Sequence, residues 1–344
     1  MKKWITLGAL LLAACTPAGI APVPLTVMTH DSFSISEGVV QEFEAANDAT
    51  VAFIKSGDAG AALNKAILSS SSPLADVFFG VDNTFLTRAL DAGIFEAYRS
   101  PALSNIPDEF QLDPGHRALP VDYGDVCINY DKSFFASRDL AVPGSLEDLV
   151  HPEYRDLLVV ENPASSSPGL AFLLATVKHF GDPGYLDFWR QLRLNGVVVV
   201  DGWETAYYTN FSGSSGQGPQ PLVVSYATSP AAEVMFASAP LTDSPTASII
   251  GPDSCFRQIE FVGILKGTPR LELAKRFVDF MLSSEFQADV PGQMFVYPVL
   301  PGVSLPDPFT QYAQVPAQPA TLPPGEIALK RDAWIKSWTA VVLH

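Results

Sequence analysis

Short apolar runs alternate with amphipathic segments along most of the chain. The apolar runs are rich in β-branched and aromatic residues, which favours strands, whereas apolar positions between them recur at helical spacing. Such alternation predicts a mostly parallel sheet with helices on both faces, and therefore an α/β fold. The predicted strands are 24–29, 51–54, 76–80, 157–160, 197–200 and 222–225, and the predicted helices include 61–68, 170–179, 184–194 and 272–283.

Two long extended segments, 118–131 and 256–265, interrupt this pattern. Because roughly 320 mature residues exceed what one hydrophobic core usually serves, we expect two lobes joined by a two-strand hinge. The predicted first lobe comprises 25–122 and 256–305, and the second comprises 125–254. A Pro-rich surface segment and a docked C-terminal helix with core tryptophans should follow within 306–344.

The first fifteen residues predict export. Lys2 and Lys3 precede an apolar stretch that ends in Leu-Ala-Ala before Cys15, which is typical of a lipoprotein signal peptide with a lipobox. We expect Cys15 to be lipidated and 16–24 to form a flexible tether, with an ordinary signal peptide as the alternative. The predicted product is exported and lipid-anchored at the cell membrane, on its periplasmic or extracellular face.

Composition limits the chemistry further. The formal net charge of −16 argues against nucleic acid as a partner and is compatible with a cationic ligand. After Cys15 only Cys127 and Cys255 remain, and they are either one disulfide or two buried thiols. We find no Cys/His cluster with zinc spacing, no Gly-rich phosphate loop and no Gly-x-Ser-x-Gly motif, so no metal, cofactor or catalytic residue is predicted.

Aromatic and hydroxyl side chains follow two strands of the second series. Four valines, 197–200, predict a short buried strand that is followed by Trp203, Tyr207 and Tyr208. The next strand along the chain leads to Tyr226 and then to a threonine and a serine. Ligands of open α/β sheets bind beyond the carboxyl ends of strands, so neighbouring strand ends of this kind predict a small, partly planar, polar ligand. The alternative places Trp203 and Tyr207 in the core.

Six short motifs follow one another along the chain. They are Thr29-His30-Asp31-Ser32-Phe33, Val81-Asp82-Asn83, Asp122-Tyr123-Gly124, Ser165-Ser166-Ser167-Pro168-Gly169-Leu170, Asp201-Gly202-Trp203-Glu204-Thr205-Ala206-Tyr207 and Ser225-Tyr226-Ala227-Thr228-Ser229-Pro230. In this order, over about residues 24 to 340, they resemble the thiamine-binding proteins of bacterial ABC importers. The resemblance implies a type II periplasmic-binding-protein fold and a monomer that hands thiamine or its phosphates to a membrane permease. It implies neither enzymatic activity nor a cofactor, because thiamine would be the transported ligand.

The resemblance also implies which residues contact the ligand. A thiazolium cation suits the faces of Trp203 and Tyr226, at roughly 0.5 to 2 kcal/mol each, and Asp58 could accept a hydrogen bond from the pyrimidine amine. The hydroxyl and N–H groups of the serines and threonine suit a hydroxyethyl group or a phosphate. The implied ligand contacts are Asp58, Ala59, Ser166, Ser167, Trp203, Tyr226, Ala227, Thr228 and Ser229, with His30, Asp31, Tyr207 and Phe295 as further candidates.

The sequence also departs from that family and leaves rival functions open. Two tryptophans that the family tends to have are missing; Phe295 is the substitute we expect for one, and Glu37 could compensate for the other with a charge. Ferric-iron-binding proteins with the same fold use two adjacent tyrosines as iron ligands, and Tyr207 and Tyr208 form such a pair. A polyamine or a phosphonate is a further alternative for the bound solute. His30, Asp201 and Glu204 could form the acid/base set of an enzyme. The sequence shows no arrangement of nucleophile, base and orienting group to go with them.

Overall fold

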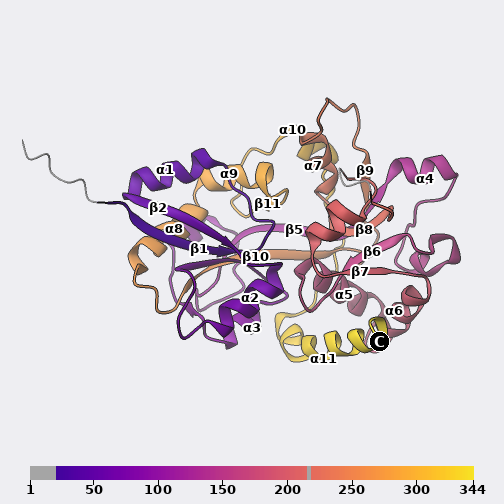
Figure 1. Cartoon of the computed structure of the whole chain (residues 1–344), viewed down its shortest axis with the longest axis horizontal. Coiled ribbons are helices and arrows are strands. Elements are labelled where there is room, and N and C mark those ends of the chain that lie inside the picture. Colours follow the sequence, from indigo (N-terminus) through magenta and orange to yellow (C-terminus); the bar gives the residue numbers. More distant parts are fainter. Residues whose placement is uncertain (1–20, 215–217) are drawn as a thin grey trace, which may run out of the picture.

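The computed structural model describes residues 21–214 and 218–344, and these form a single mixed sheet covered by helices (Figure 1). Within those residues the main path of the sheet runs β2-β1-β3-β10-β5-β8-β6-β7. The strands are β1 (Val23–Thr29), β2 (Ala49–Lys55), β3 (Val77–Asp82), β4 (Phe95–Glu96), β5 (Leu119–Asp131), β6 (Leu158–Glu161), β7 (Val198–Val200), β8 (Leu222–Tyr226), β9 (Thr246–Ile249), β10 (Phe256–Leu265) and β11 (Tyr297–Pro298).

Helices flank this sheet at both ends. The α-helices are α1 (Glu37–Asn47), α2 (Ala59–Leu68), α3 (Leu86–Asp91), α4 (Lys132–Arg138), α5 (Ser167–Phe180), α6 (Tyr185–Leu194), α7 (Ser229–Met235), α8 (Leu271–Met281), α9 (Ser284–Gln293), α10 (Asp307–Tyr312) and α11 (Pro324–Val342). Short 3₁₀ turns lie at Pro101–Asn105, Asp108–Phe110, Glu147–Val150 and Pro152–Tyr154, and Thr205–Asn210 forms a π-helix. No helix in 21–214 or 218–344 is long and apolar enough to cross a membrane.

The predicted two-lobed α/β fold is confirmed. In the first lobe β1 pairs in parallel with β2 and β3, and in the second lobe β6 pairs in parallel with β7 and β8. The long strands β5 and β10 are antiparallel neighbours that run through both lobes (Figure 1). Strand β10 pairs with β3 on one side, and β5 pairs with β8 on the other. These two strands are therefore the hinge that the extended segments predicted.

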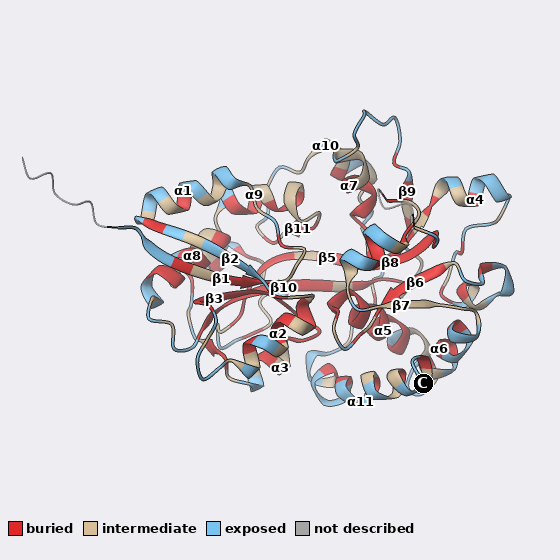
Figure 2. Cartoon of the chain, viewed as in Figure 1, coloured by how far each residue is buried: buried red, intermediate tan, exposed pale blue. Residues whose placement is uncertain are grey.

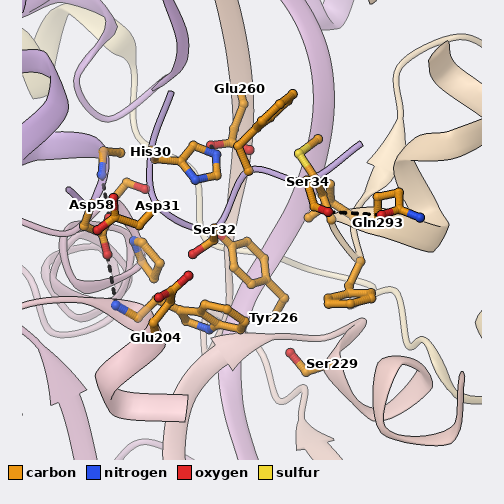
Figure 3. A pocket seen from close by; sticks show the side chains of 18 of the residues that line it. His30, Asp31, Ser32, Ser34, Asp58, Glu204, Tyr226, Ser229, Glu260 and Gln293 are labelled. Carbon is orange, nitrogen blue, oxygen red and sulfur yellow. Dashed lines mark hydrogen bonds and ion pairs between the residues drawn. The ribbon is translucent and has the colours of Figure 1, made fainter. Parts of the chain in front are cut away.

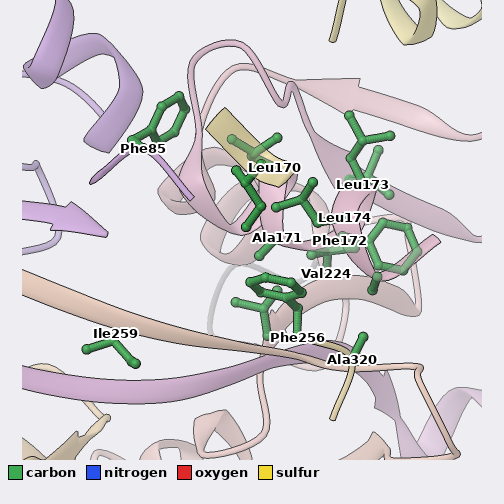
Figure 4. Packing of buried hydrophobic residues seen from close by; sticks show 14 of the residues in the cluster. Phe85, Leu170, Ala171, Phe172, Leu173, Leu174, Val224, Phe256, Ile259 and Ala320 are labelled. Carbon is green, nitrogen blue, oxygen red and sulfur yellow. The ribbon is translucent and has the colours of Figure 1, made fainter. Parts of the chain in front are cut away.

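The buried residues follow the central strands and the helices packed on them (Figure 2). Helix α5 is apolar around most of its circumference, and its residues 167–177 are all buried. Because it lies between the sheet and other helices, its Leu170 and Phe172 pack in the same cluster as Phe256 and Ile259 of β10 (Figure 4). The C-terminal helix α11 docks on this cluster, and Trp338 packs edge-on against Trp189 at 5.5 Å between ring centroids.

Four sequence predictions need correction. Strand β7 is half-buried rather than buried, because it lies at the end of the main sheet path, where β6 is its one partner strand within 21–214 and 218–344. It is also not adjacent to β8, since β6 lies between them. The Pro-rich stretch contains the short helix α10, whose Phe309 is buried, and the expected tether overlaps β1, which begins at Val23. Cys15 lies outside the described residues.

The two cysteines form a disulfide between the hinge strands. Cys127 lies in β5 and Cys255 immediately precedes β10, where Val126 pairs with Phe256. Both cysteines are fully buried and pack with Ala227, which follows β8. The open choice between one bridge and two free thiols is therefore settled in favour of the bridge.

Candidate functional site

A cavity of about 260 Å³ lies between the lobes, beside the hinge strands (Figure 3). The loop after β1, the first turn of α2 and the segment before β11 line it from the first lobe, and the residues after β7 and β8 line it from the second. Its lining residues are His30, Asp31, Ser32, Phe33, Ser34, Lys55, Asp58, Ala59, Ser167, Pro168, Trp203, Glu204, Tyr208, Tyr226, Ser229, Glu260, Gln293, Met294, Phe295 and Val296.

Aromatic side chains form one wall, and each is held from behind. The indole Nε1–H of Trp203 donates to the Ser225 hydroxyl at 2.9 Å, and its ring stacks on Tyr207 with centroids 5.0 Å apart. The ring of Tyr226 lies against Gly124 of β5, where an added Cβ would be 2.8 Å from it. Because each ring is fixed by such contacts, its face is presented to the cavity with little freedom to lose on binding.

A hydrogen-bonded chain connects this wall to the hinge. The Tyr226 hydroxyl donates to Gln258 Oε1 at 3.0 Å, and Gln258 Nε2 donates to the Ser167 hydroxyl at 2.8 Å. Gln258 belongs to β10, whereas Ser167 begins α5 in the second lobe. The hinge strand therefore positions both the ring of Tyr226 and the hydroxyl of Ser167.

His30 and Glu260 meet on the opposite side of the cavity (Figure 3). His30 Nε2 lies 3.5 Å from Glu260 Oε1, and the ring of His30 occupies the space beside Gly80, where a Cβ would be 2.3 Å away. Burial lowers the pKa of His30 to about 4, so the imidazole is neutral near pH 7. A neutral His30 therefore does not compensate the negative charge that Glu260 can carry.

Further carboxylates lie behind the cavity. Asp82 ends β3, Asp122 lies in β5, and Glu161 ends β6, and all three are buried. Loss of hydration raises the pKa of Asp82 and of Asp122 to about 7 and raises the pKa of Glu161 and Glu260 well above the usual range. Within the described residues, neither carboxylate oxygen of Glu161 has a hydrogen-bond partner on another residue. The site is thus rich in acidic groups whose charge depends on what lies beside them.

Asp58 makes a direct contact between the lobes. The Ala59 N–H donates to Asp58 Oδ1 at 2.6 Å, which caps α2, and the Trp203 N–H donates to Asp58 Oδ2 at 2.9 Å. Loss of hydration raises the pKa of Asp58, and the N–H groups of Trp203 and Ala59 oppose that shift. In this structure the carboxylate therefore faces protein donors of both lobes.

The structure brings most of the predicted site residues together. Those that line the cavity are Asp58, Ala59, Ser167, Trp203, Tyr226, Ser229, His30, Asp31 and Phe295. Ser166 and Ala227 are buried outside the lining, and the Thr228 hydroxyl donates to the Phe295 carbonyl. Glu37 lines a separate surface groove beside α1 and does not face the cavity, because α1 packs on the outer side of the first lobe.

Sequence reasoning missed Gln258 and Glu260. These residues lie two apart in β10, so their side chains share one face of a strand whose other residues, apart from Arg257, are apolar or glycine. Buried polar residues in such a strand are unusual, and that spacing was a usable signal. Gln293 and Met294 come from the end of α9 and carried no comparable signal.

The adjacent tyrosines both line a second cavity together with Glu233, but they differ in what they bind. The Tyr207 hydroxyl donates to Glu233 at 2.8 Å and its ring packs with Phe211, whereas Tyr208 also lines the cavity between the lobes. The two rings are nearly perpendicular, at 88°. Burial raises the pKa of Tyr207 well above its usual range, which disfavours the tyrosinate that ferric iron needs. In the described parts of the chain no group of three or more His, Cys, Asp or Glu residues is placed to hold a metal ion.

Two α/β lobes with a cavity between them, joined by two crossing strands, define the periplasmic-binding-protein fold. The structure resembles that of a periplasmic thiamin binding protein with a TM-score of 0.81 and 28% identity, covering 94% of this chain and 99% of the other. It also resembles a ferric binding protein from Campylobacter jejuni, with a TM-score of 0.74 and 18% identity over 92% of this chain and 99% of the other. The second likeness shows the shared fold alone.

The sequence comparisons agree with the fold. The sequence model of the bacterial extracellular solute-binding protein family matches residues 72–319. A thiamine-binding periplasmic protein of Escherichia coli (strain K12) is 32% identical over 337 residues, which cover 96% of this chain and 97% of the relative. The chain belongs to the bacterial extracellular solute-binding protein family.

Proposed function

We propose that this chain captures thiamine, free or phosphorylated, between its two lobes and delivers it to an ABC permease. The observation that supports this proposal best is the ring of Trp203, which Ser225 and Tyr207 hold at a cavity that contains several carboxylates. A flat organic cation gains both from an aromatic face and from nearby acidic groups. The full-length likeness to thiamine-binding proteins points to the same ligand.

Capture would use the hinge strands β5 and β10. The solute enters an open form, and rotation about these strands closes the cavity over it. Trp203 and Tyr226 belong to the second lobe, whereas Glu260 lies on the hinge and Asp31 in the first lobe. Closure therefore completes a site that neither lobe contains alone, and the closed form would present both lobes to the permease.

The decisive experiment is isothermal titration of the chain lacking residues 1–15 with thiamine, thiamine monophosphate and ferric citrate. We expect thiamine to bind, Trp203→Ala to weaken binding by more than tenfold, and Trp203→Phe to lose less because it keeps an aromatic face. Circular dichroism of both variants controls for folding. Binding of ferric citrate without thiamine, with a visible tyrosinate-to-iron band, would replace this proposal with iron transport.

The mature protein would act as a lipid-anchored monomer without catalysing a reaction. The Leu-Ala-Ala sequence before Cys15 supports lipidation at that cysteine. We expect intact protein in the membrane fraction and Cys15→Ala in the soluble or precursor fraction. Incubation with thiamine and its phosphates should return each compound unchanged, and detection of a cleaved product would show an enzyme instead.

A further inference from the structure

Three carboxyl side chains stand in a row across the middle of the sheet. Glu260 of β10 pairs directly with Asp82 of β3 on one side and with Asp122 of β5 on the other. Directly opposed residues of antiparallel strands point to the same face of the sheet, with Cβ atoms about 5 Å apart. Asp82 and Asp122 are fully buried, whereas Glu260 is 7% exposed and lines the cavity (Figure 3). We call these three residues the carboxyl row.

The carboxyl row has too few hydrogen-bond donors for three ionised groups. Asp82 Oδ1 accepts from the N–H and hydroxyl of Thr84 and from the N–H of Phe85. No N–H or hydroxyl group of the described residues donates to Asp82 Oδ2 or to either carboxyl oxygen of Asp122. A buried carboxylate without a donor is strongly destabilised. A proton on Glu260 supplies the missing donor to Asp122, so these two groups act as one acid pair.

The other titratable groups that face Glu260 do not offset a fully ionised row. Among the described residues they are His30 after β1, Asp58 before α2 and Tyr226 at the end of β8. His30 is neutral near pH 7, because burial lowers its pKa to about 4. Burial raises the pKa of Tyr226 well above its usual range, so its hydroxyl also stays neutral. Asp58 can only add negative charge.

The rest of the cavity wall carries more negative charge than positive. Asp31 and Glu204 line it, and Lys55 is the only lysine or arginine among the described lining residues. Lys55 is exposed, so water and salt screen its charge. Three carboxylates on neighbouring strands would therefore repel one another inside the protein with one screened cation near them.

We propose that the carboxyl row exchanges a proton for the cationic solute, so that capture releases a proton to water and acid releases the solute. The exchange rests on the proposed function, whereas retention of a proton by the empty row does not. In the empty protein the proton satisfies Asp122 and limits the repulsion. A cation beside Glu260 stabilises the ionised carboxylate, so the proton leaves and the positive charge of the solute takes its place.

Proton linkage gives the sign and the size of the effect. The pKa of Asp82 and of Asp122 is raised to about 7 in the empty protein, and that of Glu260 is raised further. A bound cation lowers the pKa of the row, so affinity rises with pH between the bound and the empty values. Release of one proton for each solute corresponds to a change in Kd of up to about tenfold per pH unit. The aminopyrimidine of thiamine titrates in more acidic solution, so the slope near neutral pH reports on the protein.

The test is isothermal titration of the chain lacking residues 1–15 with thiamine at about pH 6, about pH 7 and about pH 8. Two buffers that differ in their enthalpy of ionisation are used at each pH, and the difference in heat gives the number of protons released. Asp122→Asn provides an amide donor to Glu260 in place of the shared proton, at a position that does not line the cavity. The matched control is Glu204→Gln, which removes a carboxylate from the cavity wall outside the carboxyl row. Thermal unfolding verifies that both variants are folded.

We expect the wild type to release about one proton for each thiamine bound near pH 7, and its affinity to rise at least about tenfold from about pH 6 to about pH 8. In Asp122→Asn the number of protons released should fall by at least about half, and the affinity should change by less than about threefold over the same range. Glu204→Gln should bind more weakly but keep the wild-type slope and proton release. Equal heats in both buffers with a pH-independent affinity of the wild type would overturn the proposal, as would a full wild-type slope in Asp122→Asn.

Infrared absorption of the ligand-free protein separates failure of this proposal from failure of the proposed function. A retained proton gives the wild type a carboxylic acid band at neutral pH that Asp122→Asn lacks. If no form of thiamine binds, the choice of solute is wrong, and the difference between these two spectra decides whether the empty row holds a proton. If thiamine binds tightly without releasing protons, the solute is right and the carboxyl row does not exchange its proton.

Discussion

The buried carboxylates make stability depend on pH in a direction that can be tested with Asp82→Asn. Asp82 is fully buried at the end of β3, and its Oδ1 accepts hydrogen bonds from Thr84 and Phe85. In the described structure its Oδ2 has no hydrogen-bond partner. The pKa of Asp82 is raised from 3.8 to about 7, so the folded protein holds its proton more tightly than the unfolded chain does.

The sign and size of this pH dependence of stability follow from proton linkage. A carboxyl group with a raised folded-state pKa stabilises the protein at low pH, and this contribution is lost as pH rises through the folded-state value. A shift from 3.8 to about 7 corresponds to about 4 kcal/mol in total, of which about 3 kcal/mol is lost between about pH 5 and about pH 8. His30 acts in the opposite direction, since its pKa is lowered to about 4 and it destabilises the fold as pH falls.

Urea unfolding followed by tryptophan fluorescence, at intervals from about pH 5 to about pH 8, measures this effect. The free energy of unfolding of Asp82→Asn should fall less over that range than that of the wild type, by about 3 kcal/mol. Glu42→Gln, an exposed change on α1, should follow the wild type. Parallel curves for Asp82→Asn and the wild type would show that Asp82 is ionised in the folded protein throughout, and would refute the argument.

Three further changes test the hinge and the core. Replacing both Cys127 and Cys255 with serine removes a bridge that closes a 128-residue separation, which should lower the free energy of unfolding by about 5 kcal/mol; the reduced wild type should match the variant. Gly124→Ala places a Cβ 2.8 Å from the ring of Tyr226, so titration should show solute affinity reduced about tenfold with the fold intact. Trp338→Ala should cost about 3 to 5 kcal/mol of unfolding free energy in urea, because the side chain is fully buried where α11 docks.

Local patterns predicted the strands of the main sheet path and the two-lobed plan of the fold, but not the short strands β4, β9 and β11 or the helix α10. Helical spacing and β-branched runs report which face of a short segment is buried, and neither depends on distant residues. The extended segments that became β5 and β10 revealed the hinge for the same reason. The aromatic residues after β7 and β8 were found because strand ends of α/β sheets are where ligands bind.

The tertiary structure alone decided how these parts meet. Strand β6 lies between β7 and β8, and strand order depends on long-range pairing that local patterns do not record. The same is true of Asp58, whose carboxylate binds Trp203 across the lobes, and of Tyr207, whose hydroxyl donates to Glu233.

By itself, the sequence determined the α/β class, the two series of elements, the crossing strands and nine of the twenty residues that line the cavity. Only the tertiary structure decided that the cysteines are bridged, that β6 separates the aromatic strands, and that the buried Asp82 and Asp122 lie on strands paired beside Glu260, which lines the cavity. The spacing of apolar residues along a helix or strand indicates which of its faces is buried. Convergence of side chains from different strands is set by the folded chain as a whole, because it brings together groups separated by a hundred residues or more, such as Asp82 and Glu260.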